Sequence, residues 1–276
     1  MVHTNFQGNS DEFRERVWEY YRHYGRDFAW RRTYDPYEIV VSEIMLQQTQ
    51  VSRIEKRFPE FLSRFPTFEA LAQAPLRDVL EAWQGIGYNR RAKYLQRIAE
   101  VVTYDYNGQL PQTPDQLNKL PGIGEATSGS IAAFAFQYPA VFIETNIRRA
   151  YLYWFFPEEE NVSDRDLYPL VADTIDTEHP REWYYALQDY GNMLAAYVGN
   201  PNRRSKHYHK QSPFEGSNRQ VRSFILQILL EHGPLTEEQI THTFSYPESR
   251  IPDNLRTMTG EGIIRFNADE TYSVEE

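Results

Sequence analysis

The sequence predicts an all-α body followed by a small α+β unit at the C-terminal end. Across the first 200 residues, apolar side chains recur every three or four positions, which is the period of an amphipathic helix. Short turns containing Pro or Gly separate these segments, and no apolar–polar alternation is long enough to require a sheet. A chain of 276 residues has room for one large domain and a smaller one.

The body is predicted to consist of helices joined by tight turns. Residues 38–65 have the helical period, and Pro59 predicts a break or kink within them. Residues 68–106 predict two or three further helices, interrupted at Pro75 and at the glycines of WQGIGY. Residues 113–136 then predict a helix, a tight turn and another helix.

A different pattern begins near Ser217. Residues 219–244 predict a helix, a Gly-Pro turn and a second helix that Thr236 caps. Residues 251–276 predict a third helix and two strands, GIIRF and TYSV, that form a hairpin. This order is typical of a winged helix-turn-helix, and the alternative is a generic α+β appendage. The preceding segment, 200–218, has the Pro-, Gly- and polar-rich composition of a linker.

The composition restricts the possible chemistry and location. The chain has no cysteine, which excludes disulfides, thiolate catalysis, cysteine-ligated zinc and iron–sulfur clusters. No apolar run of about 18 residues is present to span a membrane, and the N-terminal residues lack the apolar core of a signal peptide. We therefore expect no membrane association and a cytoplasmic (nucleoid) or otherwise intracellular location.

The charge distribution bears on nucleic-acid binding. A net charge of −10 argues against a nucleic-acid partner, but cations collect locally near the linker. Between residues 201 and 225, one acid accompanies six cations: Arg203, Arg204, Lys206, Lys210, Arg219 and Arg222. This strip could neutralise phosphates, and the alternative is a solvated linker. His207 and His209 lack nearby carboxylates, so we expect ordinary surface residues and no metal site.

The segment LPGIGEATSG predicts a phosphate-binding turn. Gly122 and Gly124 permit a sharp turn and a close backbone approach. The following helix begins near Ala126 and Thr127, and its first amides would point outward to clamp a phosphate independently of sequence. Many ordinary helical hairpins use glycine in the same way, so the turn alone is weak evidence.

Three motifs together carry a family resemblance. The glycine turn is followed by ETNIRR at 144–149, DPYEIVVSEIMLQQTQV occupies 35–51, and WQGIGYNRRAKYL occupies 83–95. These segments resemble the helix–hairpin–helix, Gly/Pro-rich-loop (HhH-GPD) superfamily of DNA glycosylases, and within it the MutY-type adenine glycosylases. The resemblance extends from about residue 28 to residue 191.

The resemblance implies roles for the residues in these motifs. Glu43 would be the general acid that protonates the leaving base, and Glu144 would stabilise the sugar cation or act as the nucleophile. Gln47 and Gln48 would insert at the DNA, and Tyr88 would wedge beside the mispaired base. The DNA-binding set would comprise Gln47, Gln48, Tyr88, Gly122, Gly124, Ala126, Thr127, Asn146, Arg148, Arg203, Arg204 and Lys206. Without the family resemblance, the ordinary interpretation is a solvated helix residue for Glu43 and a helix N-terminal acid for Glu144.

Two departures from the family pattern affect catalysis. Glu144 stands where the family has aspartate, and a misplacement near 1 Å can cost about a hundredfold in rate. Ala126 stands where bifunctional glycosylase/lyases have lysine, so no Schiff base forms there and we predict a monofunctional hydrolase.

Two further departures affect architecture. The cluster-binding cysteines are missing from 186–210, so no iron–sulfur cofactor is expected, whereas the hairpin leaves room for a monovalent cation. The domain that reads 8-oxoguanine in MutY is expected to be replaced by the winged-helix-like unit. We expect three parts: 1–34 with 141–212 as one helical subdomain, 35–140 as a six-helix subdomain containing the hairpin, and 217–276 as the winged-helix-like domain.

The resulting hypothesis is a monofunctional adenine DNA glycosylase of base excision repair, acting on A:G or A:8-oxoguanine pairs. The expected partner is double-stranded DNA with a mismatched or damaged base, and the expected state is a monomer. One alternative keeps the fold and changes the base to uracil, thymine or hypoxanthine. Another, motivated by Glu144, is a catalytically inactive lesion-binding module.

Overall fold

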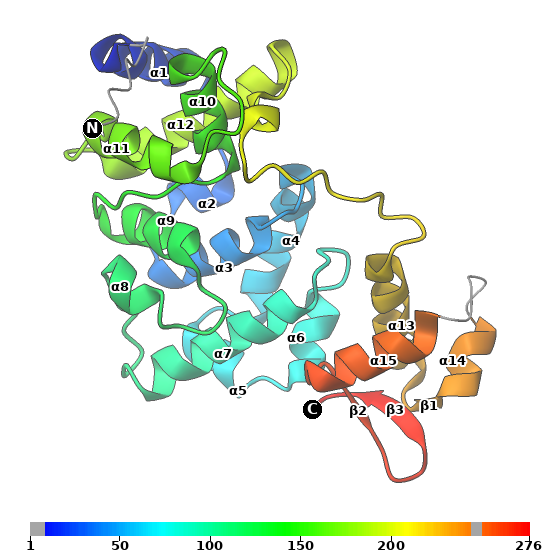
Figure 1. The fold of residues 1–276 in the computed structure, drawn as a ribbon. Coiled ribbons are helices and arrows are strands. Elements are labelled where there is room, and N and C mark those ends of the chain that lie inside the picture. The colour runs from blue at the N-terminus through cyan, green and yellow to red at the C-terminus, as the bar shows by residue number, and fades with distance from the viewer. Residues whose placement is uncertain (1–8, 244–249) are drawn as a thin grey trace. The chain divides into compact units, whose positions relative to one another are not determined.

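The computed structural model describes residues 9–243 and 250–276 (Figure 1). These residues are mostly helical, with one three-stranded sheet near the C-terminus. This confirms the predicted all-α body and α+β end. The first eight residues of the expected 1–34 segment, and residues 244–249 of the expected 217–276 domain, lie outside the described residues. Within the described ranges, none of the helices combines the length and the apolar run that crossing a bilayer requires.

The contacts of the chain divide it into two compact units. The first comprises the described residues of Met1–Val40, Pro111–Lys119 and Ile123–Lys210, and the second those of Val41–Leu110, Leu120–Gly122 and Gln211–Glu276. The three-part division expected from the sequence stays a prediction. Helix α3 (Pro36–Leu46) begins in the first unit and ends in the second.

The first unit is built around two helices that pack against each other, α10 and α12. It contains α1 (Ser10–Tyr24), α2 (Ala29–Arg32), α8 (Pro114–Leu117), α9 (Glu125–Phe136), α10 (Thr145–Phe155), α11 (Asp164–Thr174), α12 (Pro180–Tyr197) and η1 (Pro201–Arg204). Figure 1 shows α1, α10, α11 and α12 gathered together, and α12 contacts both α10 and α1. The ring centroid of Phe13 in α1 lies 4.9 Å from that of Tyr151 and 5.2 Å from that of Phe155. Aromatic contacts therefore fill this core.

The helical part of the second unit contains α4 (Val51–Arg64), α5 (Phe68–Gln73), α6 (Leu76–Ala82) and α7 (Arg90–Tyr104). Of the break or kink expected at Pro59, a break does not occur, because α4 runs through that residue, and the chain bends at 47–50. The hydrogen bond that Pro59 cannot donate would go to the carbonyl of Glu55, which is an exposed residue that water can reach.

The C-terminal part of the second unit follows the predicted order. Helices α13 (Asn218–His232), α14 (Glu237–Thr243) and α15 (Ile251–Gly260) precede the hairpin of β2 (Ile264–Phe266) and β3 (Thr271–Val274). A further strand, β1 (Leu235–Thr236), pairs antiparallel with β3 and gives the sheet order β1-β3-β2. A strand of two residues is too short to show apolar–polar alternation, so β1 could not be predicted from the sequence.

The predicted cap of the second helix in this part is confirmed. The Thr236 amide donates to Gln239 Oε1 at 2.8 Å, and the Gln239 amide donates to Thr236 Oγ1 at 3.3 Å. This reciprocal pair is a capping box at the start of α14.

Candidate active site and DNA-contacting residues

Glu43 lies in the C-terminal half of α3, among residues of the protein core. Val41 and Met45 are fully buried and Ile44 nearly so, whereas Glu43 is only partly exposed. Partial exposure lets Glu43 meet a ligand. Its role as the proton donor stays a prediction.

Two of the residues predicted to touch the lesion have unusual backbone conformations. Gln48, in the bend after α3, has φ +53°, and Tyr88, before α7, has φ +51°. Non-glycine residues in the left-handed region cost about 1–3 kcal/mol each and persist only where the surroundings impose them. Both residues are on the surface, and 37% of Tyr88 is exposed. Their conformations therefore require support from elsewhere in the second unit.

Arg91, which the sequence did not single out, provides this support. Its guanidinium donates to the backbone oxygens of Ile44, Met45, Gln47 and Gly87 and to Oγ1 of Thr49, at 2.6–3.0 Å. The same group lies 5.4 Å from the ring centroid of Tyr88. Burial lowers the pKa of Arg91 to about 10, so the side chain remains charged at neutral pH. One buried cation thus fixes both the 47–50 bend and the segment before Tyr88.

Replacing Arg91 by methionine is expected to destabilise the protein by about 3 kcal/mol or more, because several buried oxygens lose a charged donor. The Arg91→Lys variant should lose less stability, since three ammonium donors can satisfy part of the set. Urea unfolding measures both. Arg97→Met, at an exposed position of the same helix, is the control. An equal loss in the control would show that Arg91 has no special role.

The helix–turn–helix predicted at 113–136 is confirmed as α8, a turn and α9. Gly122 has φ +73°, and a Cβ at this position would lie 2.7 Å from the ring of Tyr94, so only glycine fits. Gly124 is exposed and caps α9, with Ala126 and Thr127 in the first turn. Phosphate binding by these amides stays a prediction.

Glu144 is the N-cap of α10 in the first unit. Its Oε1 accepts hydrogen bonds from the backbone amides of Asn146, at 2.8 Å, and Ile147, at 3.0 Å. The side-chain amide of Asn146 lies 3.4 Å from Oε2. The interpretation of Glu144 as a helix N-terminal acid is thus confirmed, and its catalytic role remains a prediction.

Opposing influences act on the charge of Glu144. Burial raises the pKa of Glu144, whereas the two amides and the guanidinium groups of Arg148 and Arg149 lower it. The net shift is upward. Protonation of this carboxyl group in the free protein is therefore easier than that of an ordinary glutamate.

The two arginines after Glu144 are held by protein groups. Arg148 makes a two-point ion pair with Asp164, at 2.6 and 2.7 Å. Arg149 donates to Asn146 Oδ1 at 2.7 Å and to the Gly191 oxygen at 2.9 Å. A Cβ on Gly191 would lie 2.1 Å from the Asn146 oxygen, so this glycine lets α12 approach the start of α10. Sequence patterns alone do not mark Gly191 as part of this site.

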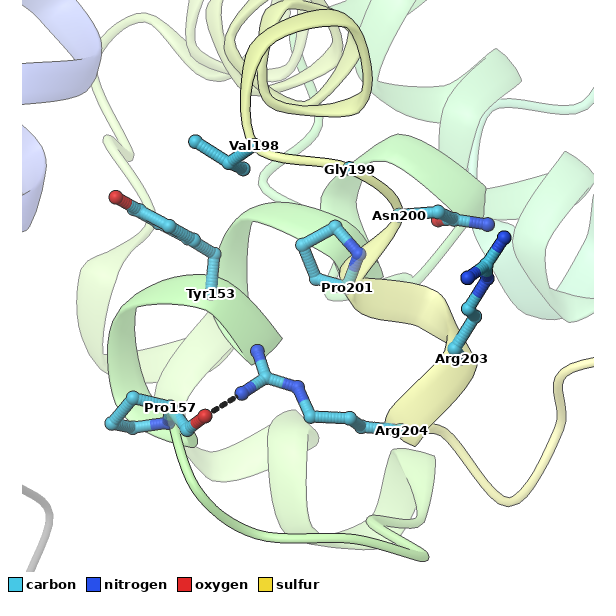
Figure 2. Close-up of a pocket in the computed structure, with 8 residues that line it drawn as sticks. All are labelled: Tyr153, Pro157, Val198, Gly199, Asn200, Pro201, Arg203 and Arg204. Atoms are coloured by element: carbon cyan, nitrogen blue, oxygen red, sulfur yellow. Dashed lines mark hydrogen bonds between the residues drawn. The ribbon is translucent and has the colours of Figure 1, made fainter.

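The segment expected in place of the cluster loop forms η1, which packs on α10. Asn202 Nδ2 donates to the Thr145 oxygen at 2.9 Å. A pocket of about 410 Å³ lies here, lined by Tyr153, Pro157, Val198, Gly199, Asn200, Pro201, Arg203 and Arg204. Figure 2 shows the Arg204 guanidinium bonded to the backbone oxygen of Pro157. Nη2 of the same group donates to the backbone oxygen of Leu152 at 2.8 Å.

Two other cations of this segment, Arg203 and Lys206, are exposed. Among the described residues, no three His, Asp or Glu side chains are grouped to hold a metal ion.

Comparisons with known proteins agree with these features. Residues 41–167 match the family described as HhH-GPD superfamily base excision DNA repair protein. An adenine DNA glycosylase of Mycolicibacterium smegmatis is 31% identical over 281 residues, covering 92% of this chain and 93% of the relative. An adenine DNA glycosylase of Buchnera aphidicola is 32% identical over 187 residues, covering 66% of this chain but only 52% of that relative.

Among solved structures, a thermostable thymine-DNA glycosylase matches with a TM-score of 0.64 and 26% identity, covering 70% of this chain and 90% of that one. The family match includes both the Glu43 and the Glu144 segments, and the mycobacterial relative aligns over nearly its whole length. The chain therefore belongs to the HhH-GPD superfamily of base excision DNA repair glycosylases, in its MutY-type branch.

Proposed function

We propose that the protein is a monofunctional DNA glycosylase that hydrolyses the N-glycosidic bond of a flipped-out adenine, paired with guanine or 8-oxoguanine. The observation that carries the proposal is the support given to Gln48 and Tyr88. One buried arginine fixes the segments of both residues, together with the end of the helix that carries Glu43. Preorganised surface side chains of this kind suit insertion into the gap that a flipped base leaves.

The proposed chemistry uses two carboxyl groups. The Glu43 carboxyl donates its proton to a ring nitrogen of the base, and the bond from that base to the sugar breaks with its electron pair leaving on the base. The Glu144 carboxylate stabilises the positive charge that develops on the sugar. Water then adds to the sugar carbon and releases a proton. Ala126 provides no amine, so the sugar is not captured as a Schiff base and the strand stays intact.

The proposed DNA contacts fall into two classes. The amides near Gly122 and Gly124, and the exposed cations Arg203 and Lys206, bind phosphates without regard to sequence. Arg148 and Arg204 already engage an acid and carbonyl oxygens, so they position the surrounding backbone for DNA contact. The proposed partner is double-stranded DNA, bound by a monomer without a resident cofactor.

A panel of duplexes tests this function. With the full chain in excess over substrate, we expect free adenine from A:G and A:8-oxoguanine duplexes, measured by chromatography of the released base. The product strand should break only after alkali treatment, as expected of a hydrolase without lyase activity. Release of a different base, with adenine retained, would overturn the adenine assignment.

A second candidate keeps the fold and changes the base. The thymine-DNA glycosylase among the structural neighbours favours thymine, and by chemistry uracil, as that base. G:T and G:U duplexes in the same panel test this directly. Tight binding to mismatched DNA without release of any base would favour the inactive lesion-binding module.

A further inference from the structure

The segment that joins the helical body to the C-terminal helices contacts Tyr88. Gln211 Nε2 donates to the Tyr88 hydroxyl oxygen, and Arg219 Nη1 lies 3.4 Å from the same oxygen. The Arg219 guanidinium carbon is 5.8 Å from the centroid of the Tyr88 ring. All three residues belong to the second unit. Two side chains from beyond the family match therefore meet the predicted wedge.

Arg219 is itself held in place by the linker. Its Nη2 donates to the backbone oxygens of Ser212 and Pro213, and its guanidinium carbon lies 6.0 Å from the ring centroid of Phe214. These hydrogen bonds, to Tyr88, Ser212 and Pro213, use three of the five N–H donors of Arg219. The residue is partly exposed, so a ligand beside Tyr88 can reach it.

Hydrogen bonds also join the C-terminal helices to α6 and α7 of the same unit. Lys93 Nζ of α7 donates to the backbone oxygens of Glu261 and Gly262, both at 2.8 Å. Arg222 pairs with the Glu261 carboxylate, and Arg77 donates to the Leu230 oxygen at 2.6 Å. These bonds join the C-terminal helices to α6 and α7, and Tyr88 lies just before the start of α7.

We propose that Gln211 and Arg219 are part of the DNA-reading site: Gln211 positions Tyr88, and Arg219 reads the base opposite the excised one. This inference rests on the proposed function of Tyr88 as the wedge beside the mispair. A guanidinium can only donate hydrogen bonds, and guanine and 8-oxoguanine both present the O6 acceptor. On the major-groove edge cytosine presents only its N4 donor, so an arginine that reads this edge favours a guanine-type partner. The C-terminal helices then serve to present this arginine.

The decisive measurement is the ratio of rates for two opposite bases. Adenine release from A:G and A:C duplexes is measured at single turnover for the full chain and its variants. Arg219→Ala is expected to lower the A:G to A:C rate ratio by about tenfold, and Arg219→Lys to restore part of it. Gln211→Ala should slow both reactions alike. Arg256→Ala, which removes an exposed arginine of α15 paired with Asp253, is the control and should leave the ratio unchanged.

A binding readout separates this inference from the proposed activity. Affinities are measured for duplexes with a tetrahydrofuran abasic analogue opposite guanine or cytosine, which requires no catalysis. Arg219→Ala should reduce the preference for guanine by a similar factor. An unchanged guanine preference, or an equal and salt-dependent loss on both duplexes, would mean that Arg219 contacts only phosphate and would overturn the inference. Absence of adenine release by the wild type would instead count against the proposed function.

Discussion

Replacing Glu43 by glutamine is expected to lower the single-turnover rate of base release by about 10²- to 10⁴-fold. Glutamine has nearly the same shape as glutamic acid but cannot donate a proton to the leaving base. The backbone oxygens around Glu43 remain bonded to Arg91 in this variant, and Val41 and Met45 remain buried. The loss should therefore fall on the chemical step, with folding and DNA affinity nearly unchanged.

The matched control for Glu43 is Glu55→Gln, which removes an exposed carboxyl group from α4 in the same unit. Its rate should equal that of the wild type. Rates come from chromatography of the released base, affinities from binding to the uncleaved duplex, and stability from urea unfolding. If Glu43→Gln retained more than about a tenth of the rate, another group would be the proton donor.

Local sequence patterns predicted most of the fold, because each rests on neighbouring residues. The glycine turn of the hairpin, the cap at Thr236 and the final strand pair were all predicted from short segments, and the structure confirms them. Helix α4 does not break at Pro59 because one missing helical hydrogen bond on an exposed turn is tolerated, whereas the bend at 47–50 contains no proline.

The parts of the site that could not be predicted depend on contacts between distant residues. Arg91 binds mainly backbone oxygens 44–47 residues away, and any residue type supplies such oxygens. Arg148 was expected to meet DNA because its motif resembles that of the family, and Arg204 because it lies in a run of cations, but Asp164 and the carbonyl oxygen of Pro157 already engage them. Charge counts along a sequence cannot show which cations have protein partners.

Replacing Glu144 by glutamine is expected to slow base release by about 10²- to 10³-fold, since the negative charge that stabilises the sugar cation is lost. The helix cap should survive, because an amide oxygen can still accept from the Asn146 and Ile147 amides. Single-turnover rates and unfolding curves of the same preparations separate these effects. A variant that lost its folded structure instead would identify the carboxylate as mainly structural.

The raised pKa of Glu144 also gives this variant a pH signature. Between the ordinary value of 4.5 and the raised native pKa, the folded protein binds the proton more tightly than the unfolded chain does. Wild-type stability therefore falls as pH rises through this window, and the penalty remains at higher pH. Glu144→Gln lacks this titration, so its stability relative to the wild type should increase from pH 4.5 upward. Urea unfolding across this range measures the difference, and a constant difference would contradict the raised pKa.

The aspartate variant tests whether the longer side chain suits this site. With one oxygen tied to the amides at the start of α10, Glu144→Asp would draw the carboxylate back by about 1 Å, and we expect about a hundredfold loss of rate. Aspartate is a good helix cap, so stability should not fall. A large gain in rate would instead mean that the natural glutamate holds its charge away from the sugar, and the inactive lesion-binding alternative would then be favoured.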